Sequence, residues 1–285
     1  MLEPLVAAAT EADVREMALR RCVDEGSRRL YIALAEAAPR GAWVARDEGT
    51  PIAIGFARAL EDEWYLSELF VEPSFRRQGL GSALLREVAR DAGDVWRSGM
   101  LDAGESGGMR FFLKRGVGLQ VPVLRVAGEI PKEDDLLQMA AGEYRFATLP
   151  IDPRGHVTIL AALDREARGT GRPHDHTMFA QSATGTLLLI NDEVVGYAYV
   201  WPDGRIGPLV AASSAYLTQF FGFALVSLRR TYGASWCMAL VPGSNVRVMR
   251  AATRIGLQFD ELRIFATDLP QMDLSRYIGY HALDF

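Results

Sequence analysis

The chain has 285 residues, of which 49% are hydrophobic and 24% charged, and its formal net charge is −5. The length leaves room for two domains of ordinary size, and the composition is typical of a soluble globular protein. The negative charge excludes a generally basic surface, so we expect neither nucleic acid nor an anionic membrane as a partner. The first residues resemble neither a signal nor a transit peptide, and no apolar run is as long as a membrane span, so we expect a cytoplasmic protein.

The sequence contains two cysteines, Cys22 and Cys237, which lie far apart. Their spacing is not that of metal ligands, and free cysteines are usually buried in apolar surroundings. We therefore expect two reduced thiols and no metal site.

The first part of the chain predicts two helices between short strands. Leu5 to Ala9 favours a strand, and Thr10 is a candidate cap for a helix that begins there. A second helix is expected at about Ser27 to Ala38, before the proline that follows. Strands are expected at Trp43 to Arg46 and at Ile52 to Ala59, and the polar residues between them predict a hairpin turn.

The stretch from Leu66 to Arg90 joins a strand, a loop and a helix. Leu66 to Pro73 is apolar at alternate positions and ends at a proline, as a strand would. From Ser82 on, apolar residues recur every three or four positions, which predicts a helix with one buried face. The loop between them contains two arginines and two glycines: Arg76, Arg77, Gly79 and Gly81.

This junction predicts a site for an anion. The first N–H groups of a helix have no partner within it, and the helix dipole adds partial positive charge there. Gly79 and Gly81 allow the backbone to come close to a bulky anion, and the two arginines add fixed positive charge. A phosphate or pyrophosphate is the ligand that such a site favours.

Two familiar phosphate loops do not fit this sequence. A dinucleotide-binding loop needs a third glycine where Leu84 stands, and a P-loop needs a lysine where Ser82 stands. The run from Arg76 to Gly81, directly after a Leu-Phe-Val-Glu-Pro strand, instead resembles motif A of the GNAT superfamily of acyl-CoA-dependent N-acyltransferases. In that family the loop wraps the pyrophosphate of coenzyme A. An ordinary strand, turn and helix with a solvated arginine pair is the alternative.

The resemblance implies an α/β (α+β) fold for residues 1–128, with a mixed, mostly antiparallel sheet flanked by helices. The rest of this half agrees with such a fold. Strands are expected at about Trp96 to Leu101 and Val117 to Val126, with a helix from Ser106 to Lys114 between them. The predicted order of this N-terminal domain is β-α-α-β-β-β-α-β-α-β.

Residues 129–142 are polar, contain a proline and a charged run, and predict a linker. Beyond them, residues 143–285 repeat the pattern of the first half. Gly55 and Gly196 lie in similar strands, Gly116 and Gly256 follow similar helices, and the two pairs have almost the same separation along the chain. We infer a duplicated fold, that is, two tandem GNAT-type domains.

The second half lacks the chemistry of the loop. Between Val210 and Phe220 it has neither arginine nor glycine where the pyrophosphate would rest, and an aromatic residue such as Tyr216 would crowd a phosphate. This half resembles the degenerate C-terminal acetyltransferase domains of tandem GNAT proteins, which implies a retained fold and lost coenzyme binding.

The resemblance also implies which residues bind acetyl-CoA. The backbone of the strand end would hold the pantetheine arm and face the developing oxyanion, and the loop would hold the pyrophosphate. The implied residues are Leu69, Phe70 and Val71 in the strand and Arg76, Arg77, Gln78, Gly79, Leu80, Gly81 and Ser82 in the loop.

Glu68 is the candidate general base. It stands where many family members carry an acidic residue on the acceptor side of the thioester, and it would act directly or through a water. Desolvation near the floor of a cleft would raise its pKa toward neutrality. The alternative is a strand-edge glutamate that only orders the substrate or faces solvent. We interpret Glu72 as solvated.

The family's second signature is incomplete here. It consists of an asparagine and, seven residues later, a tyrosine that protonates the leaving thiolate. These positions hold Glu105 and Phe112 in the first half and Asn245 and Ala252 in the second. Because phenylalanine has no proton to give, two functions stay open. One is an N-acetyltransferase that moves an acetyl group from acetyl-CoA to a primary amine of a small molecule or peptide. The other is a non-catalytic acyl-CoA-binding or regulatory module.

Two segments of the second half carry further interpretations. His174-Asp175-His176 has the residue types of a metal cluster, but no third ligand at a suitable spacing, so we interpret it as a solvated loop or the rim of a pocket. The closing segment, Met272 to Phe285, is rich in aromatic residues. We expect it to dock on a domain or on a subunit partner, which leaves a homodimer open.

Overall fold

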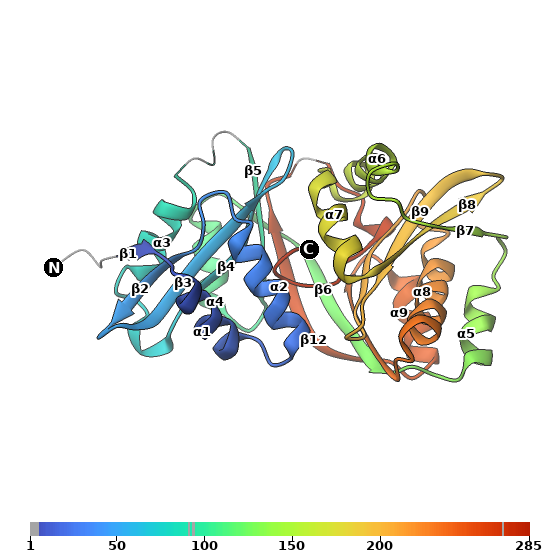
Figure 1. Ribbon diagram of the computed structural model, residues 1–285, viewed down its shortest axis with the longest axis horizontal. Coiled ribbons are helices and arrows are strands. Elements are labelled where there is room, and N and C mark those ends of the chain that lie inside the picture. The colour runs from blue at the N-terminus through green and yellow to red at the C-terminus, as the bar shows by residue number, and fades with distance from the viewer. Residues whose placement is uncertain (1–5, 91, 93–94, 270) are drawn as a thin grey trace. The chain divides into compact units, whose positions relative to one another are not determined.

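The computed structural model describes residues 6–90, 92, 95–269 and 271–285. By its internal contacts the chain divides into two compact units, Met1–Met100 and Leu101–Phe285. Both units combine helices with β-sheet, and the strand pairs are mostly antiparallel (Figure 1), as the predicted fold class requires. Leu5, the first residue of the first predicted strand, lies outside the described residues.

The first series of elements has the predicted order. It comprises β1 (Val6–Ala8), α1 (Glu11–Arg21), α2 (Glu25–Glu36), β2 (Trp43–Asp47), β3 (Thr50–Ala59), β4 (Glu63–Val71), the 3-10 turn η1 (Pro73–Phe75), α3 (Leu80–Val88), β5 (Trp96–Asp102), α4 (Ser106–Leu113) and β6 (Gly118–Glu129). Thr10 caps α1 as predicted, because its hydroxyl accepts from the Asp13 amide and the Asp13 carboxylate accepts from the Thr10 amide.

The second series repeats that order. It comprises β7 (Ala147–Pro150), α6 (Val157–Arg168), α7 (Pro173–Ser182), β8 (Thr184–Ile190), β9 (Glu193–Val200), β10 (Ile206–Ala211), α8 (Leu217–Tyr232), β11 (Trp236–Pro242), α9 (Val246–Arg254) and β12 (Gln258–Thr267). The starts of β11, α9 and β12 follow the starts of β5, α4 and β6 at one constant offset along the chain. The repeat expected from the sequence is therefore a repeat of secondary structure.

In the first unit, β1 to β4 pair antiparallel in sequence order and β5 pairs parallel to β4. The β2–β3 turn has positive φ at Glu48 (47°) and Gly49 (85°), which suits a two-residue hairpin turn. Leu80 and Leu84 of α3 belong to a buried cluster with Ala53 of β3. On the other face, Tyr31 of α2 packs edge-on against Phe56 of β3.

In the second unit, one sheet has the order β13-β10-β9-β8-β7, where β13 is Tyr277–Ile278. Its side chains are sorted by strand alternation. Ala198 and Val200 of β9 belong to the buried cluster that includes α8, whereas Tyr197 and Tyr199 contact His176 of α7. The helices of this unit thus cover both faces of its sheet (Figure 1).

The contact-based division differs from the predicted domain boundary at residue 128. The reason is that β6 pairs along its length with β11 and β12 of the second series, so residues 118–129 belong by their contacts to the second unit. Assignment of residues 1–128 and 143–285 to two domains rests on the repeat and stays a prediction.

The predicted linker is folded in part. Its residues 133–140 form helix α5 (Glu133–Ala140), in which Leu136 is fully buried. Leu136 joins the buried cluster of α8, and the Gln219 side chain of α8 donates to the Ala140 carbonyl. Polar composition concealed this helix because only one face of it is covered.

The closing segment docks on the second unit, as expected from its aromatic residues. It contains the 3-10 turn η2 (Leu274–Arg276) and strand β13, and Tyr277, Tyr280 and Phe285 are fully buried. Among the residues that the structure describes, no helix combines the length and apolarity needed to cross a membrane.

Candidate functional site

Strand β4 changes its pairing in the middle. Phe56 of β3 faces Glu68, but the next residue, Ala57, faces Leu66, so Ser67 is an extra residue that forms a β-bulge. On its other side β4 pairs with β5 only as far as Leu66 and Gly99, within the described residues. After the bulge, β4 therefore still pairs with β3 along one edge. Along the edge that faces β5, its residues pair with no other described strand.

The loop after β4 adopts backbone conformations that favour glycine. Arg77 has φ of 66°, and Gly79, at the cap of α3, has φ of 88°. Helix α3 begins at Leu80, two residues earlier than the apolar pattern predicts, because the left-handed Gly79 turns the chain directly into the helix. Arg76, Arg77, Gln78 and Gly79 are exposed.

The start of α3 presents a group of unused donors. No acceptor is found among the described residues for the backbone N–H groups of residues 77 to 81, whereas the Ser82 and Ala83 amides both donate to the Gly79 carbonyl at 3.0 Å. Consecutive free amides at a helix N-terminus bind anions. A Cβ on Gly81 would lie 3.7 Å from Val71, an ordinary contact.

The side chains of the loop hold its shape. Arg76 donates from Nε to the Val71 carbonyl at 3.0 Å, which ties the loop to the end of β4. Its neighbour Arg77 is exposed, and the Gln78 amide reaches the Ser74 carbonyl at 3.5 Å. Leu80 is buried and anchors the first turn of α3. Positive charge thus lies beside the free amides.

Glu68 and Phe70 lie on the face of β4 that helices α1 and α2 cover. The Glu68 side chain is 10% exposed, and its Oε2 lies 3.6 Å from Nε of Arg21 at the end of α1. The same guanidinium lies 4.1 Å from the centre of the Phe70 ring, a cation–π contact. On the opposite face, Leu69 and Val71 pack against the cluster of α3.

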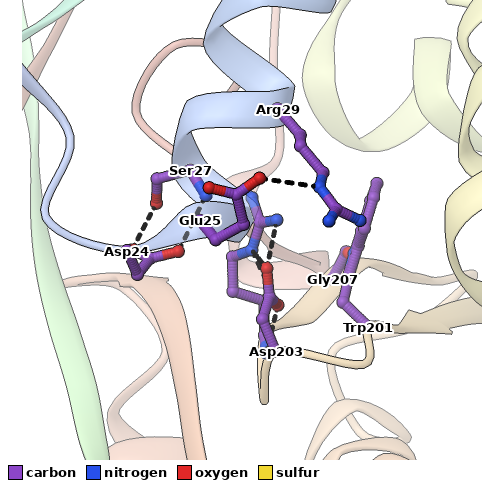
Figure 2. A network of polar contacts seen from close by, with 8 residues as sticks. Asp24, Glu25, Ser27, Arg29, Trp201, Asp203 and Gly207 are labelled. Carbon is purple, nitrogen blue, oxygen red and sulfur yellow. Dashed lines mark hydrogen bonds and ion pairs between the residues drawn. The ribbon is translucent and has the colours of Figure 1, made fainter. Parts of the chain in front are cut away.

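Helix α2 brings a buried hydroxyl to this face. Its first turn is capped by Asp24, whose carboxylate accepts from the Ser27 amide and hydroxyl, both at 2.7 Å (Figure 2). Tyr31, further along the helix, is fully buried, and within the described part of the chain its hydroxyl has no hydrogen-bond partner. The hydroxyl of Ser67, next to Glu68 in the sequence, is also buried and also lacks a hydrogen-bond partner among the described residues.

The negative charge of Glu68 affects the pKa values of two neighbouring groups on this face. Burial and then the Glu68 charge raise the pKa of the Cys22 thiol to about 11. The same two causes raise the pKa of Tyr31 well above its ordinary value. Both groups are therefore neutral near pH 7.

Glu72, which we interpret from the sequence as solvated, is partly exposed. Its side chain is 30% exposed, and it lies 3.7 Å from Nη1 of Arg20. Arg20 also donates to the Pro51 carbonyl at 2.9 Å, so this pair fastens α1 to the edge of the sheet.

Some of the backbone donors in the corresponding loop of the second unit are in use. Between β10 and α8 the Ala215 amide donates to the Ser213 hydroxyl, the Tyr216 amide to the Ser213 carbonyl and the Leu217 amide to the Ser214 carbonyl. The Tyr216 ring packs edge-on against Tyr144 at 4.7 Å between centroids. The Thr218 and Gln219 amides at the start of α8 have no acceptor among the described residues. This loop therefore differs from residues 77 to 81 in its side chains, which include neither arginine nor glycine.

The positions of the second signature correspond between the halves. Glu105 directly precedes α4 and Asn245 directly precedes α9. Phe112 is buried on α4 and Ala252 is fully buried on α9. Asn245 donates to the Leu274 and Tyr277 carbonyls at 3.0 and 2.8 Å, so in the second half this residue holds the closing segment.

The interpretation of His174 to His176 as a solvated loop or pocket rim is wrong. These residues lie in α7, where Asp175 and His176 are buried. Pro173 at the first helical position is the signal in the sequence that would have indicated a helix. In the part of the chain that the structure describes, no group of three metal-ligating side chains is found.

His176 belongs to a buried polar cluster that sequence reasoning missed. Its Nε2 lies 2.9 Å from Asp164 and its Nδ1 3.2 Å from the Tyr199 hydroxyl, while Tyr197 donates to Asp164 at 2.5 Å. Burial alone would raise the pKa of Asp164, but Arg172 and the hydrogen bonds lower it below its ordinary value. The members are fully buried, so they are not exposed to a substrate, and we expect the cluster to act on the stability of the unit.

Comparison with known proteins identifies the fold. The acetyltransferase (GNAT) family model matches residues 11–114. No curated protein sequence matches the chain.

Solved structures with this fold span almost the whole chain. A candidate acetyltransferase from Pyrococcus horikoshii has a TM-score of 0.72 and 17% identity, over 100% of this chain and 96% of its own. A GCN5-related N-acetyltransferase from Sphaerobacter thermophilus has a TM-score of 0.63 and 18% identity, over 95% and 98%. A tandem GNAT protein from the clavulanic acid biosynthesis pathway has a TM-score of 0.61 and 17% identity, over 92% and 97%. At such identities the likeness shows the fold alone.

Proposed function

We propose, from the premise that residues 11–114 form a GNAT-family domain, that this protein is an N-acetyltransferase which moves an acetyl group from acetyl-CoA to a primary amine. The family and the fold are those of acetyltransferases in general. The observation that carries the proposal is the set of free backbone N–H groups at residues 77 to 81, which lies directly after the bulged end of β4.

The loop residues would hold the pyrophosphate. Free amides donate to phosphate oxygens without any change of structure, and the charge of Arg76 and Arg77 adds attraction. The unpaired edge of β4 after the bulge would hold the pantetheine arm through backbone groups of Leu69, Phe70 and Val71. An extended chain with amide groups fits such an edge as another strand would.

The acceptor amine would approach from the face that carries Glu68. Attack on the thioester carbonyl needs an uncharged amine, so a base must remove a proton, and Glu68 is the carboxylate on this face beside the strand end. A backbone N–H at the strand end would stabilise the developing oxyanion. The leaving thiolate needs a proton from a group other than Phe112, such as the incoming ammonium by way of water.

A non-catalytic acyl-CoA-binding or regulatory module is the second candidate function. The observation that favours it is Phe112, a buried phenylalanine on α4 where the family has its tyrosine. The pair of Glu68, whose side chain is 10% exposed, and Arg21 favours the enzyme, because a module that only binds coenzyme has no use for a carboxylate at this face.

The two functions are separated by measuring binding and turnover on the same protein. Calorimetry with acetyl-CoA measures binding, and release of free CoA with a panel of amines, from polyamines to peptide N-termini, measures turnover. The enzyme predicts release that depends on both substrates. Binding of acetyl-CoA without release for any amine would establish the second function, and lack of binding would overturn both.

The partner and the location belong to the same proposal. A small-molecule or peptide amine is the acceptor, neither nucleic acid nor membrane is a partner, and the location is cytoplasmic. The net charge of −5 supports a cationic acceptor and argues against polyanionic partners.

A further inference from the structure

Strands β10 and β11 are held apart by the closing segment. They meet at one parallel bridge, Arg205 to Met238, near their starts. Beyond it, Tyr277 and Ile278 pair antiparallel with β10, and Gly279 pairs antiparallel with Leu240 of β11. The chain's own strand therefore fills the gap between these two strands.

Backbone hydrogen bonds hold this strand on both sides. The Gly279 amide donates to the Leu240 carbonyl and the Leu240 amide to the Gly279 carbonyl, both at 2.8 Å. Asn245, at the start of α9, adds donors to the Leu274 and Tyr277 carbonyls. Main-chain pairing of this kind is how proteins bind an extended peptide at a sheet edge.

The wall of the gap is shaped for a peptide backbone. Gly207 of β10 has φ of 114°, and a Cβ there would lie 2.9 Å from the carbonyl carbon of Gly279. Trp201 donates from its indole N–H to the Gly207 carbonyl at 2.7 Å (Figure 2), which fixes this part of the wall. A side chain at Gly207 would thus collide with the main chain of the closing segment.

Buried pockets receive the side chains of the segment. The Tyr277 hydroxyl accepts from Arg172 at 2.9 Å. The Tyr280 ring stacks on Trp201, with 4.9 Å between centroids and 2° between planes. The Phe285 ring packs against Phe265 of β12, with 5.1 Å between centroids. Pockets for particular side chains give such a groove its specificity.

The same gap exists in the first unit without a strand in it. The parallel pair Tyr65 and Ser98 has the place in the first series that Arg205 and Met238 have in the second, at the offset that separates β5 from β11. In the first unit β4 and β5 stop pairing directly after it, at Leu66 and Gly99, among the described residues. The repeated fold thus contains two equivalent gaps, one between β4 and β5 and one between β10 and β11. The closing segment occupies the second gap, where a ligand could otherwise bind.

We propose that the gap between β10 and β11 is a peptide-binding groove whose ligand is the chain's own residues 277–285, and that this built-in strand closes the second unit to acyl-CoA. The statement about acyl-CoA rests on the proposed function, whereas the statement about the peptide does not. The second half would then exclude coenzyme in two ways, by loss of the phosphate loop and by occupation of the gap.

The test separates the segment from the chain after folding. A protease recognition sequence is inserted after Gln271, whose side chain is exposed, and the folded full chain is cleaved there. A fluorescent peptide of residues 272–285 is then added, and its binding is followed by anisotropy. We expect the cleaved segment to co-elute with the protein in gel filtration and the labelled peptide to exchange into its place.

Variant peptides show whether the groove recognises particular side chains of the segment. A Tyr277→Ala peptide loses the bond to Arg172, and a Tyr280→Ala peptide loses the stacking on Trp201, so each should bind at least tenfold more weakly. An Asp273→Asn peptide, changed at an exposed side chain that can still cap η2, should bind like the parent. Loss of the segment without change in the unfolding temperature, or equal binding of all peptides, would overturn the proposal.

A second measurement on the uncleaved chain covers the case in which cleavage unfolds the unit. Gly207→Ala should increase amide hydrogen exchange in residues 277–280, whereas Gly233→Ala, which also has positive φ but open space around it, should not. Equal exchange in both variants would contradict the proposal. For acyl-CoA, a stoichiometry of two per chain would overturn the statement that the strand closes the second unit. No binding at all would overturn the proposed function and that statement with it, and would leave the peptide groove to be decided by the peptide experiments.

Discussion

Arg21 holds Glu68 at the bulge of β4, with Nε of the guanidinium 3.6 Å from Oε2 of the carboxylate. The pair joins the last residue of α1 to the strand that precedes the anion site. A carboxylate fixed in this way keeps one orientation, which a general base at an acceptor site requires.

Glu68→Gln should lower kcat by about 10²–10⁴-fold, because an amide of the same shape cannot accept the proton of the amine. Acetyl-CoA affinity should change little, since the loop from Arg76 to Ser82 is untouched. The measurement is steady-state CoA release beside calorimetry. Glu72→Gln is the control, because Glu72 binds Arg20 at the sheet edge. An unchanged kcat in Glu68→Gln would remove Glu68 from the mechanism.

Cys22 reports the charge of Glu68. Burial and Glu68 raise the pKa of this thiol to about 11, so removal of the negative charge in Glu68→Gln should lower the pKa and increase the thiolate fraction under mildly alkaline conditions. Alkylation of Cys22 by iodoacetamide should then be severalfold faster. Cys237, whose pKa burial raises to about 12, serves as the control within the same chain. Equal alkylation rates in both proteins would show that Glu68 is not charged beside Cys22.

Tyr31→Phe should separate stability from substrate recognition. The Tyr31 hydroxyl is buried and has no partner among the described residues, so its removal should leave stability unchanged or raise it by about 1–2 kcal/mol. If the hydroxyl contacts the acceptor, KM for the amine should rise while acetyl-CoA affinity stays the same. A loss of stability would instead place the hydroxyl in the packing of the first unit.

Asp164→Asn should destabilise the second unit by about 3–5 kcal/mol, because Arg172 would keep a buried charge without its carboxylate. Glu166→Gln, two residues away on α6 and 61% exposed, should change stability by less than about 1 kcal/mol. Urea unfolding monitored by tryptophan fluorescence compares the two variants. Similar midpoints for both would contradict a stabilising role for the buried cluster.

The same carboxylate predicts a dependence on pH. Burial opposes ionisation, but Arg172, His176 and Tyr197 hold the pKa of Asp164 below its ordinary value in the folded chain. Its contribution is therefore complete above the unfolded-state pKa of about 3.9 and is lost as pH falls through the lower folded-state value. The fall in urea midpoint at pH values below that unfolded-state pKa should be smaller in Asp164→Asn than in the parent.

Local patterns in the sequence predicted the strand, loop and helix that surround the proposed anion site. The alternation before Pro73, the two glycines and the helical period after Ser82 are short-range signals, and the structure places strand, loop and helix there. The internal repeat was equally visible, because it needs only the comparison of two stretches of sequence.

Long-range packing was not predictable in the same way. Asp164 and His176 lie on separate helices, and nothing local shows that they meet in a buried cluster. The position of β13 between β10 and β11 depends on pairing with residues much earlier in the chain, which hydrophobic alternation does not encode. Helix α5 was missed because a polar, one-sided helix resembles a linker.

The central claim is that free amides at the start of α3 grip the pyrophosphate of coenzyme A. Calorimetric titration of CoA into Gly79→Ala and Gly49→Ala tests it most directly, because both glycines have nearly the same φ, 88° and 85°, and each variant carries a similar strain of about 1–2 kcal/mol. The account predicts at least tenfold weaker binding for Gly79→Ala and parent-like binding for Gly49→Ala, at one CoA per chain. Equal affinities in the two variants, or no binding by the parent protein, would contradict it.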